Sequence, residues 1–220
     1  MKRATTYAKV GKAITLTMAE SGLEAGAIAL APGFPPRAAL LVRAGLAACA
    51  ARGVPLPDAR LWLEAVPAEA LGSALGRCHE AADDGAGRPA IRIQLASPAL
   101  ARRDRSRLRV PFGLHTVLHE YAHALDQDLA PRPDADGVWG RFGRYTRAPE
   151  WRELFLAHRA RRLPYLSPQG RGSVEEFFAE AFVAYVARPA ALRPEGQVVA
   201  RTLEAALGGG ASGPARSMQE

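Results

Sequence analysis

The chain has 220 residues, of which 48% are hydrophobic and 23% are charged, and its formal net charge is +7. This composition excludes collagen-like, coiled-coil and wholly disordered proteins, and the length suffices for one compact domain with its own core. The sequence contains no window of ~20 uninterrupted apolar residues, the length that a membrane-spanning helix needs, so we expect a soluble protein without a membrane span.

The first 36 residues show little hydrophobic periodicity and end in a proline-rich stretch, which predicts a weakly ordered lead-in at residues 1–36. The domain proper is expected at residues 37–207. In its first half, the apolar spacing predicts a helix at 37–52, a strand at 60–66, a helix at 68–82 and a strand at 91–95. The second strand alternates apolar and polar residues, so we expect one wet face. As an exposed edge, it could receive an extended peptide by strand addition.

The second half of the domain is predicted to be mostly helical. The expected helices cover residues 114–128, 149–162, 173–187 and 196–207, with a loop rich in proline, aspartate and glycine at 131–143. Ser173 and Glu176 stand three residues apart at the start of the third helix, which is the capping-box pattern. Residues 208–220 are predicted to be disordered. A small sheet with helices packed on it makes α+β the expected fold class.

A five-residue motif, His119-Glu120-Tyr121-Ala122-His123, matches the H-E-x-x-H pattern of zinc peptidases. On a helix, residues four apart project from one face about 6 Å from each other, so both imidazoles can hold one tetrahedral ion. Glu120 is rotated by about 100° from His119, which places its carboxylate beside the ion, where it can take a proton from a zinc-bound water. The alternative is a helix whose histidines only cap a polar network.

The motif segment is predicted to be helical on independent grounds, because apolar residues recur through it at helical spacing. His115 lies one turn before His119 on the same face. It is about 12 Å from His123 along the helix axis, so we expect a packed or solvated histidine rather than a fourth ligand.

Two histidines need a further protein ligand, and the best candidates lie near residue 176. Glu175, Glu176 and Glu180 are interleaved there with the aromatic residues Phe178 and Phe182, which would anchor a helix in the core. A carboxylate so close to buried surface requires a metal ion or a cationic partner. For these glutamates, a solvated helix face is the alternative.

The two segments together resemble the metallopeptidase family of the anthrax toxin lethal factor catalytic domain, which includes the bacterial Pro-Pro endopeptidases. The resemblance rests on H-E-Y-A-H-A-L-D at 119–126, on Gln-Gly-Arg at 169–171 and on E-F-F-A-E-A-F at 176–182. It covers roughly residues 114–186 and implies a helix-rich, zincin-like metallopeptidase domain with a small mixed β-sheet.

The resemblance also implies roles for individual residues. The ligands of a Zn²⁺ ion would be His119, His123 and Glu176. Glu120 would be the general base. Glu180, one turn after the ligand glutamate, would accept a hydrogen bond from a ligand histidine. Asp126 would support the ligands in a similar way or help to pack its helix.

One position departs from the family pattern. Family members carry a tyrosine seven residues before the ligand glutamate, and its hydroxyl donates a hydrogen bond to the oxyanion that forms when water attacks the peptide carbonyl. Gln169 stands at that position here. Its amide can also donate but has a different reach, so cleavage would be reduced, redirected to unusual substrates or lost. Tyr165, four residues upstream, could substitute through a loop rearrangement.

The leading hypothesis is a zinc-dependent endopeptidase that acts on a peptide or protein substrate. The runner-up is a zinc-binding module of the same architecture, with weak or no proteolytic activity, that acts by protein binding. A third hypothesis, a nucleic-acid binder, draws only on charge. All but three of the 29 basic residues are arginines. Because they are scattered and only residues 102–109 form a cluster, we attribute them to base composition and do not expect nucleic-acid binding. The oligomeric state is left open.

The two cysteines, Cys49 and Cys78, make no disulfide framework and lie in segments predicted to be helical. They indicate a reducing compartment, so the cytoplasm is the favoured location. The triplet Ala29-Leu30-Ala31 is similar to a signal-peptidase cleavage site, and secretion is therefore the alternative.

Overall fold

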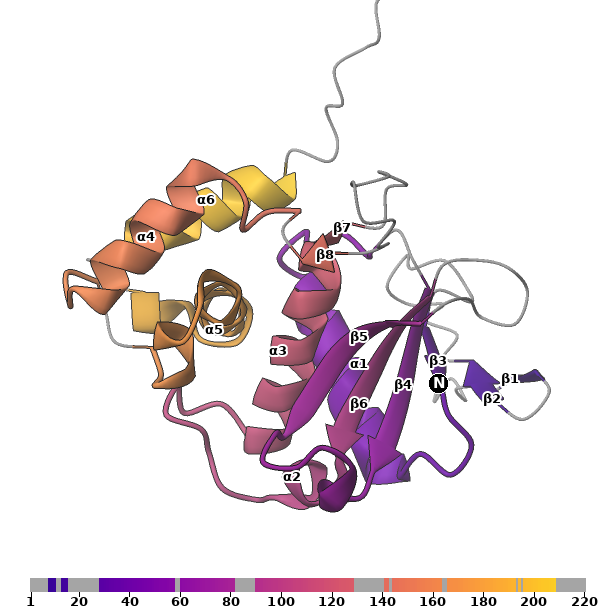
Figure 1. The fold of residues 1–220 in the computed structure, drawn as a ribbon. Coiled ribbons are helices and arrows are strands. Elements are labelled where there is room, and N and C mark those ends of the chain that lie inside the picture. The colour runs from indigo at the N-terminus through magenta and orange to yellow at the C-terminus, as the bar shows by residue number, and fades with distance from the viewer. Residues whose placement is uncertain are drawn as a thin grey trace, which may run out of the picture.

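The described part of the chain contains a six-stranded mixed β-sheet with helices packed on it and a separate two-stranded sheet (Figure 1). The computed structural model describes residues 8–10, 13–15, 28–57, 60–81, 90–128, 141–142, 144–163, 166–192, 194 and 196–208. This mixture of helices and a mixed sheet agrees with the predicted α+β class.

The sheet has six strands in the order β1-β2-β3-β4-β6-β5. Their bounds are β1 Ala8–Val10, β2 Ala13–Thr15, β3 Ile28–Leu30, β4 Arg60–Val66, β5 Gly76–Ala81 and β6 Ala90–Ala96. Strands β3, β4 and β6 run parallel, whereas β5 is antiparallel to β6. Leu61 pairs with Ile91 and Leu63 with Ile93, and all four side chains are buried, so this face of the sheet forms part of the core.

Part of the expected lead-in belongs to the sheet, so the prediction of weak order at residues 1–36 is wrong for Ile28–Leu30. The three side chains of β3 are 4%, 0% and 2% exposed, and the strand pairs with both β2 and β4. A three-residue strand that is buried throughout has no alternation, so hydrophobic periodicity could not reveal it. β1 and β2 also fall within the expected lead-in, and its other residues before Ile28 lie outside the described part.

The helix predicted at residues 68–82 is also wrong. Only a short 3-10 helix, η1 (Ala68–Ala70), forms there, and the chain then enters β5. Between them, Gly72 adopts a φ of +63°, a conformation that favours glycine and turns the chain. The alanines and leucines of this segment suit a helix, but pairing with β6, which is distant in sequence, determines the structure.

The position of β5 corrects a further prediction, that of an exposed edge at residues 91–95. β6 is paired on both sides, with β4 and with β5, so β5 is the edge strand. The predicted wet face of this strand is confirmed, because Arg92 is exposed between the buried Ile91 and Ile93.

The helices predicted at 37–52, 114–128, 149–162, 173–187 and 196–207 are confirmed to within a few residues at their ends. They are α1 Pro36–Ala50, α3 Phe112–Asp126, α4 Pro149–Arg159, α5 Val174–Ala187 and α6 Gln197–Gly208, with short helices α2 Ser97–Ala101, η2 Gln169–Arg171 and η3 Pro189–Leu192 that were not predicted. The last predicted turn of α3 is instead strand β7 (Gln127–Asp128), which pairs with β8 (Arg141–Phe142). Most of the predicted loop at 131–143 and residues 209–220 of the predicted tail lie outside the described residues.

Helix α5 packs between α3 and α4, and its side chains form much of the core. Phe177, Phe178 and Phe182 are 0% exposed. Trp151 of α4 packs edge-on against Phe178, with ring centroids 4.9 Å apart, and Tyr121 of α3 lies 6.1 Å from Phe182. α3 also contacts β5 and β6, so it lies between the sheet and α5 (Figure 1). This packing brings the first turns of α5 to the motif-bearing face of α3.

Among the residues that the structure describes, no helix is long and apolar enough to cross a membrane. Cys49 and Cys78 are both buried and free of disulfide bonds. Cys78 lies in β5 and not in a helix, in contrast to the sequence prediction.

Candidate metal centre

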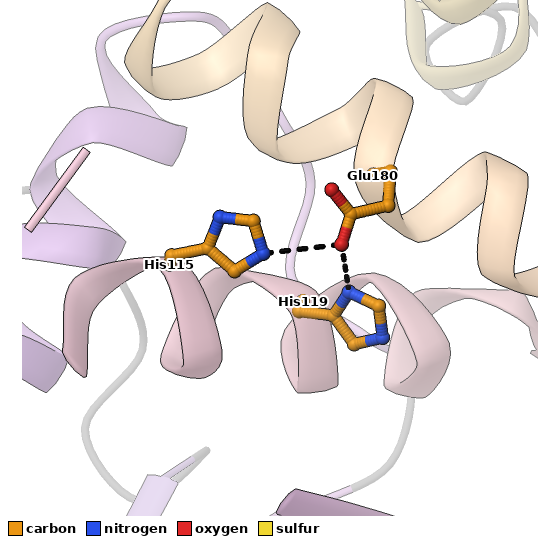
Figure 2. A group of neighbouring side chains, drawn as sticks. All are labelled: His115, His119 and Glu180. Carbon is orange, nitrogen blue, oxygen red and sulfur yellow. Dashed lines mark hydrogen bonds and ion pairs between the residues drawn. The ribbon is translucent and has the colours of Figure 1, made fainter. Parts of the chain in front are cut away.

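Three histidines of α3 follow one another at intervals of four residues and face α5 (Figure 2 shows the first two). They are His115, His119 and His123. The opposite face of α3, with Val117 and Tyr121, is buried in the core. The apolar residues therefore fix the rotation of the helix, and this rotation turns the histidines toward the carboxylates of α5.

The side-chain nitrogens of His119 and His123 and the carboxylate oxygens of Glu176 lie close together. The two Nε2 atoms of the histidines are 3.2 Å apart, His119 Nε2 lies 3.2 Å from Glu176 Oε2, and His123 Nε2 lies 3.4 Å from Glu176 Oε1. A tetrahedral ion with bonds of about 2.0–2.1 Å separates neighbouring ligand atoms by about 3.3 Å. This donor set fits such an ion, and the three residues form one of the groups in the described chain that could hold a metal. In the absence of an ion, the same contacts are hydrogen bonds and ion pairs.

Glu176 owes its position to the start of α5. Ser173 is the N-cap residue, and its Oγ accepts a hydrogen bond from the Glu176 backbone N–H at 3.3 Å, as the capping-box pattern predicts. The Glu176 carboxylate turns toward α3 rather than back to the cap. Burial alone would raise its pKa, but hydrogen bonds from His119 and His123 outweigh burial and hold the pKa well below its usual range.

Glu180 lies one turn further along α5 and contacts two histidines at once (Figure 2). Its Oε1 lies 3.2 Å from His119 Nδ1 and 3.1 Å from His115 Nε2. Burial raises the pKa of Glu180, which is 1% exposed, but hydrogen bonds from His115 and His119 outweigh burial and bring the pKa to about 2. Burial alone would lower the pKa of His119, but hydrogen bonds to Glu176 and Glu180 raise it to about 10. The carboxylate of Glu180 therefore fixes the orientation of the His119 ring.

His115, His119 and Glu180 form a second group of possible ligands within 4.8 Å of one another. This group shares His119 with the first. A neutral imidazole that binds an ion through Nε2 keeps its proton on Nδ1, so His119 cannot serve both groups as a neutral ligand. The second group is therefore better suited to support His119 by hydrogen bonding than to hold an ion of its own.

Glu120 lies on the side of α3 that faces β5. It is 6% exposed, and burial raises the pKa of its carboxyl, an effect that His119, His123 and a hydrogen bond from the Cys78 backbone N–H partly offset. Gly76, at the start of β5, lies directly against this carboxylate. The proposed base is thus beside the histidines but packed against the edge strand.

A cavity of about 420 Å³ opens at this place. It brings together the two histidines that contact Glu180, the three carboxylates, the segment that leads into β5, and residues of the loops before α3 and α5. The lining residues are Ser73, Ala74, Leu75, Gly76, Ser106, Arg107, Phe112, His115, Thr116, His119, Glu120, Ser167, Pro168, Gln169, Glu176 and Glu180.

Gln169, which the sequence resemblance aligns with a tyrosine, is exposed and lies in the wall of this cavity. It begins the short helix η2, which is held by a hydrogen bond from the Gly170 backbone N–H to the Oγ of the buried Ser167 at 3.2 Å. Tyr165, the proposed substitute, lies outside the described residues.

Asp126 lies at the C-terminal end of α3, near His123. It is 0% exposed, and its Oδ1 accepts hydrogen bonds from the backbone N–H groups of Tyr145 and Thr146 at 2.8 and 3.0 Å. Its Oδ2 accepts a hydrogen bond from Thr146 Oγ1 at 2.7 Å. Burial raises the pKa of Asp126, and these hydrogen bonds and the nearby His123 lower it in part. Of the two roles expected for Asp126, the contacts match the packing role, because they tie the end of α3 to residues 145–146.

Sequence reasoning missed three features of the cavity. His115 lies on the face that the helical period predicts, but its partner Glu180 could not be assigned from spacing alone. Gly76 gave no signal, because its segment was predicted to be a helix. Ser106 and Arg107 belong to the arginine-rich stretch 102–109, which was attributed to composition, and both line the cavity.

Comparison with protein-family models, with curated proteins and with solved structures gives no match.

Proposed function

We propose that the protein is a zinc-dependent endopeptidase with a zincin-like domain, similar in its site to the lethal factor and Pro-Pro endopeptidase family. The convergence of His119, His123 and Glu176 at 3.2–3.4 Å is the observation that carries this proposal. Glu120 lines the same cavity as His119 and Glu176. A bound zinc ion would lower the pKa of its water and polarise the scissile carbonyl.

The chain's own residues would perform the proton transfers. The Glu120 carboxylate would take up the proton of the attacking water and pass it to the leaving amine. Burial, which raises the pKa of Glu120, favours this role, because a base with a pKa nearer to neutrality both accepts and returns a proton readily. Glu180 would hold the His119 ring in the orientation that a ligand needs.

The substrate would bind as an extended strand beside β5. This strand is the sheet edge, and residues 73–76, which lead into it, line the cavity together with Glu120. An edge strand offers unpaired backbone groups to a peptide, which is how strand addition supplies affinity. The receiving edge would therefore be β5 and not the expected strand at 91–95, which is paired on both sides.

A test of the proposed function is the isosteric change Glu120→Gln. Loss of the proton acceptor is expected to lower peptide cleavage by at least ~100-fold, while zinc remains bound at about one ion per chain, because the ligands are unchanged. Cleavage of a peptide library and metal content after purification without chelator are the measurements.

Glu175→Gln is the matched control for this change. It makes the same substitution next to Glu176 but outside the cavity, so cleavage should stay at the parent level. A parent protein purified without metal, or a Glu120→Gln variant that cleaves as fast as the parent, would contradict the proposal.

A zinc-binding module with weak or no proteolytic activity is the second candidate function. The observation that favours it is the exposed Gln169 in the cavity wall, where the family resemblance predicts a tyrosine hydroxyl as oxyanion donor. In this case the cavity would bind a peptide without cutting it.

The change Gln169→Tyr separates the two candidates. If the glutamine limits catalysis, the tyrosine variant should cleave library peptides ~10- to 100-fold faster than the parent, because one oxyanion donor contributes a factor of this size or more. If the parent cleaves peptides and Gln169→Tyr cleaves them no faster, Gln169 itself serves the reaction. Absence of cleavage in both, with peptide binding retained, favours the binding module.

A further inference from the structure

We infer that Gly76 is a positioning residue for Glu120, whose carboxylate it holds in one place by bringing the backbone of the edge strand against it. The inference rests on the proposed function in so far as it gives Glu120 a catalytic task. The contact itself rests on geometry alone.

The contact leaves no room for a side chain at position 76. A Cβ atom placed on Gly76 would lie 2.4 Å from Glu120 Oε1, 2.6 Å from Cγ and 2.7 Å from Cδ. Non-bonded carbon atoms pack best at about 3.5–4.0 Å, so any other residue would force the carboxylate or the strand to move. Most of the other described glycines have open space or ordinary contacts at this position, and none has a charged group so close.

Backbone conformation does not explain the glycine. Gly33, Gly53 and Gly72 have positive φ angles, whereas Gly76 does not and pairs with Leu95 in regular antiparallel register. A glycine within a strand weakens it and often marks a close approach of another group. Here the group that approaches is the buried Glu120.

The strand also binds the carboxylate. Two residues after Gly76, the backbone N–H of Cys78 donates a hydrogen bond to Glu120. The carboxylate thus has a strand backbone on one side and the cavity on the other, and it is too buried to turn into solvent. One fixed orientation is what a general base needs, since a displacement of about 1 Å can reduce a rate ~100-fold.

The test is a double-mutant cycle of Gly76→Ala and Glu120→Asp on the zinc-loaded full chain. The aspartate side chain of Glu120→Asp is one methylene shorter than glutamate, so its carboxylate lies further from the methyl group that Gly76→Ala adds. For Gly76→Ala we expect kcat to fall ~100-fold while zinc affinity stays within about twofold, because the atoms nearest to the added Cβ belong to Glu120 and not to the ligand triad. The double variant is expected to be no slower than Glu120→Asp alone, whereas independent effects would multiply.

Gly45→Ala is the control for an added methyl group. It places a Cβ against the same helix α3, 3.4 Å from side-chain carbons of Leu114 and Leu118, without approaching Glu120. Its kcat should match that of the parent. A Gly76→Ala variant with the kcat of the parent would overturn the inference. A zinc affinity that falls by the same factor as kcat would also overturn it, because such a loss indicates a general structural role for Gly76.

Urea unfolding of the same four proteins keeps the test independent of activity. Gly76→Ala should lower the urea midpoint of unfolding. Adding Glu120→Asp to the Gly76→Ala variant should raise the midpoint again, whereas Glu120→Asp in the parent should not raise it. If the midpoint shifts of the two single changes simply add in the double variant, the inferred coupling between Gly76 and Glu120 is wrong. If the parent cleaves no peptide but the midpoints are coupled, the proposed function fails while the Gly76–Glu120 contact stands.

Discussion

His119 uses its two ring nitrogens for different partners. Nε2 faces His123 and Glu176, and Nδ1 faces Glu180, at distances of 3.2 Å throughout. If a metal ion bound, it would displace the proton that Nε2 shares with Glu176, while Nδ1, which faces Glu180, would keep its own. Glu180, which is outside the triad, would therefore set the tautomer and the orientation of His119 as a ligand.

The change Glu180→Gln tests this support. The amide keeps the shape of the side chain but removes its charge, and zinc affinity is expected to fall ~10- to 100-fold, as it does when partners of ligand histidines are altered in other metal sites. Competition with a chromophoric chelator measures the affinity. Glu175→Gln on the same helix should leave it unchanged, and an unaltered affinity in Glu180→Gln would show that His119 needs no such partner.

At the scale of elements, the start of α5 is the feature on which the candidate metal centre depends. Glu176 is the third residue after the N-cap Ser173, so the hydrogen bond that begins the helix also fixes the backbone of the ligand. The aromatic residues behind it, Phe177 and Phe178, are fully buried and prevent the turn from rotating. If the triad holds a metal ion, this capping interaction would therefore also support metal binding.

Ser173→Ala should lower the free energy of unfolding by ~1 kcal/mol through loss of the cap. It should also weaken zinc binding, because fraying of the first turn releases Glu176. Denaturant unfolding of the metal-free protein and chelator competition measure the two effects separately. Ser173→Asp, which restores a capping oxygen, should recover both the free energy of unfolding and the zinc affinity. A Ser173→Ala variant that binds zinc as tightly as the parent would show that the cap does not affect metal binding.

Prediction from sequence worked where the hydrophobic period extends over several turns or where a motif carries its own geometry. The helices around His119 and Glu176 belong to this class, and the four-residue spacing of the histidines has a single meaning on a helix. It failed at β3, which is too short and too buried for a period, and at β5, whose conformation depends on pairing with β6. Because β5 was predicted to be a helix, the contact of Gly76 with Glu120 could not be foreseen.

At the scale of the whole molecule, the candidate centre joins two helices that lie far apart in sequence. His119 and His123 come from α3 and Glu176 from α5, while α3 also rests on the sheet. An ion held by all three would bind only the folded chain, so its binding free energy would add to stability.

Removal of zinc should therefore lower the melting temperature. At a free zinc concentration of about 100 times Kd, the ion contributes ~2.7 kcal/mol, which corresponds to about 5–10 °C for a chain of this size. Differential scanning calorimetry before and after chelation measures the shift. The melting temperature of the variant His119→Ala, which lacks one proposed ligand, should not depend on zinc. If chelation leaves the melting temperature of the parent unchanged, the folded chain holds no such metal site.

The order in which the site residues occur along the chain has a consequence for biosynthesis. Gly76 and the histidines of α3 leave the ribosome before α5, which carries both Glu176 and Glu180. A nascent chain that ends before α5 has two of the three proposed zinc ligands and lacks the Glu180 carboxylate that contacts His119. On the proposed function, peptidase activity would arise only after α5 has been synthesised and has packed against α3, so unfinished chains could not cut the proteins around them.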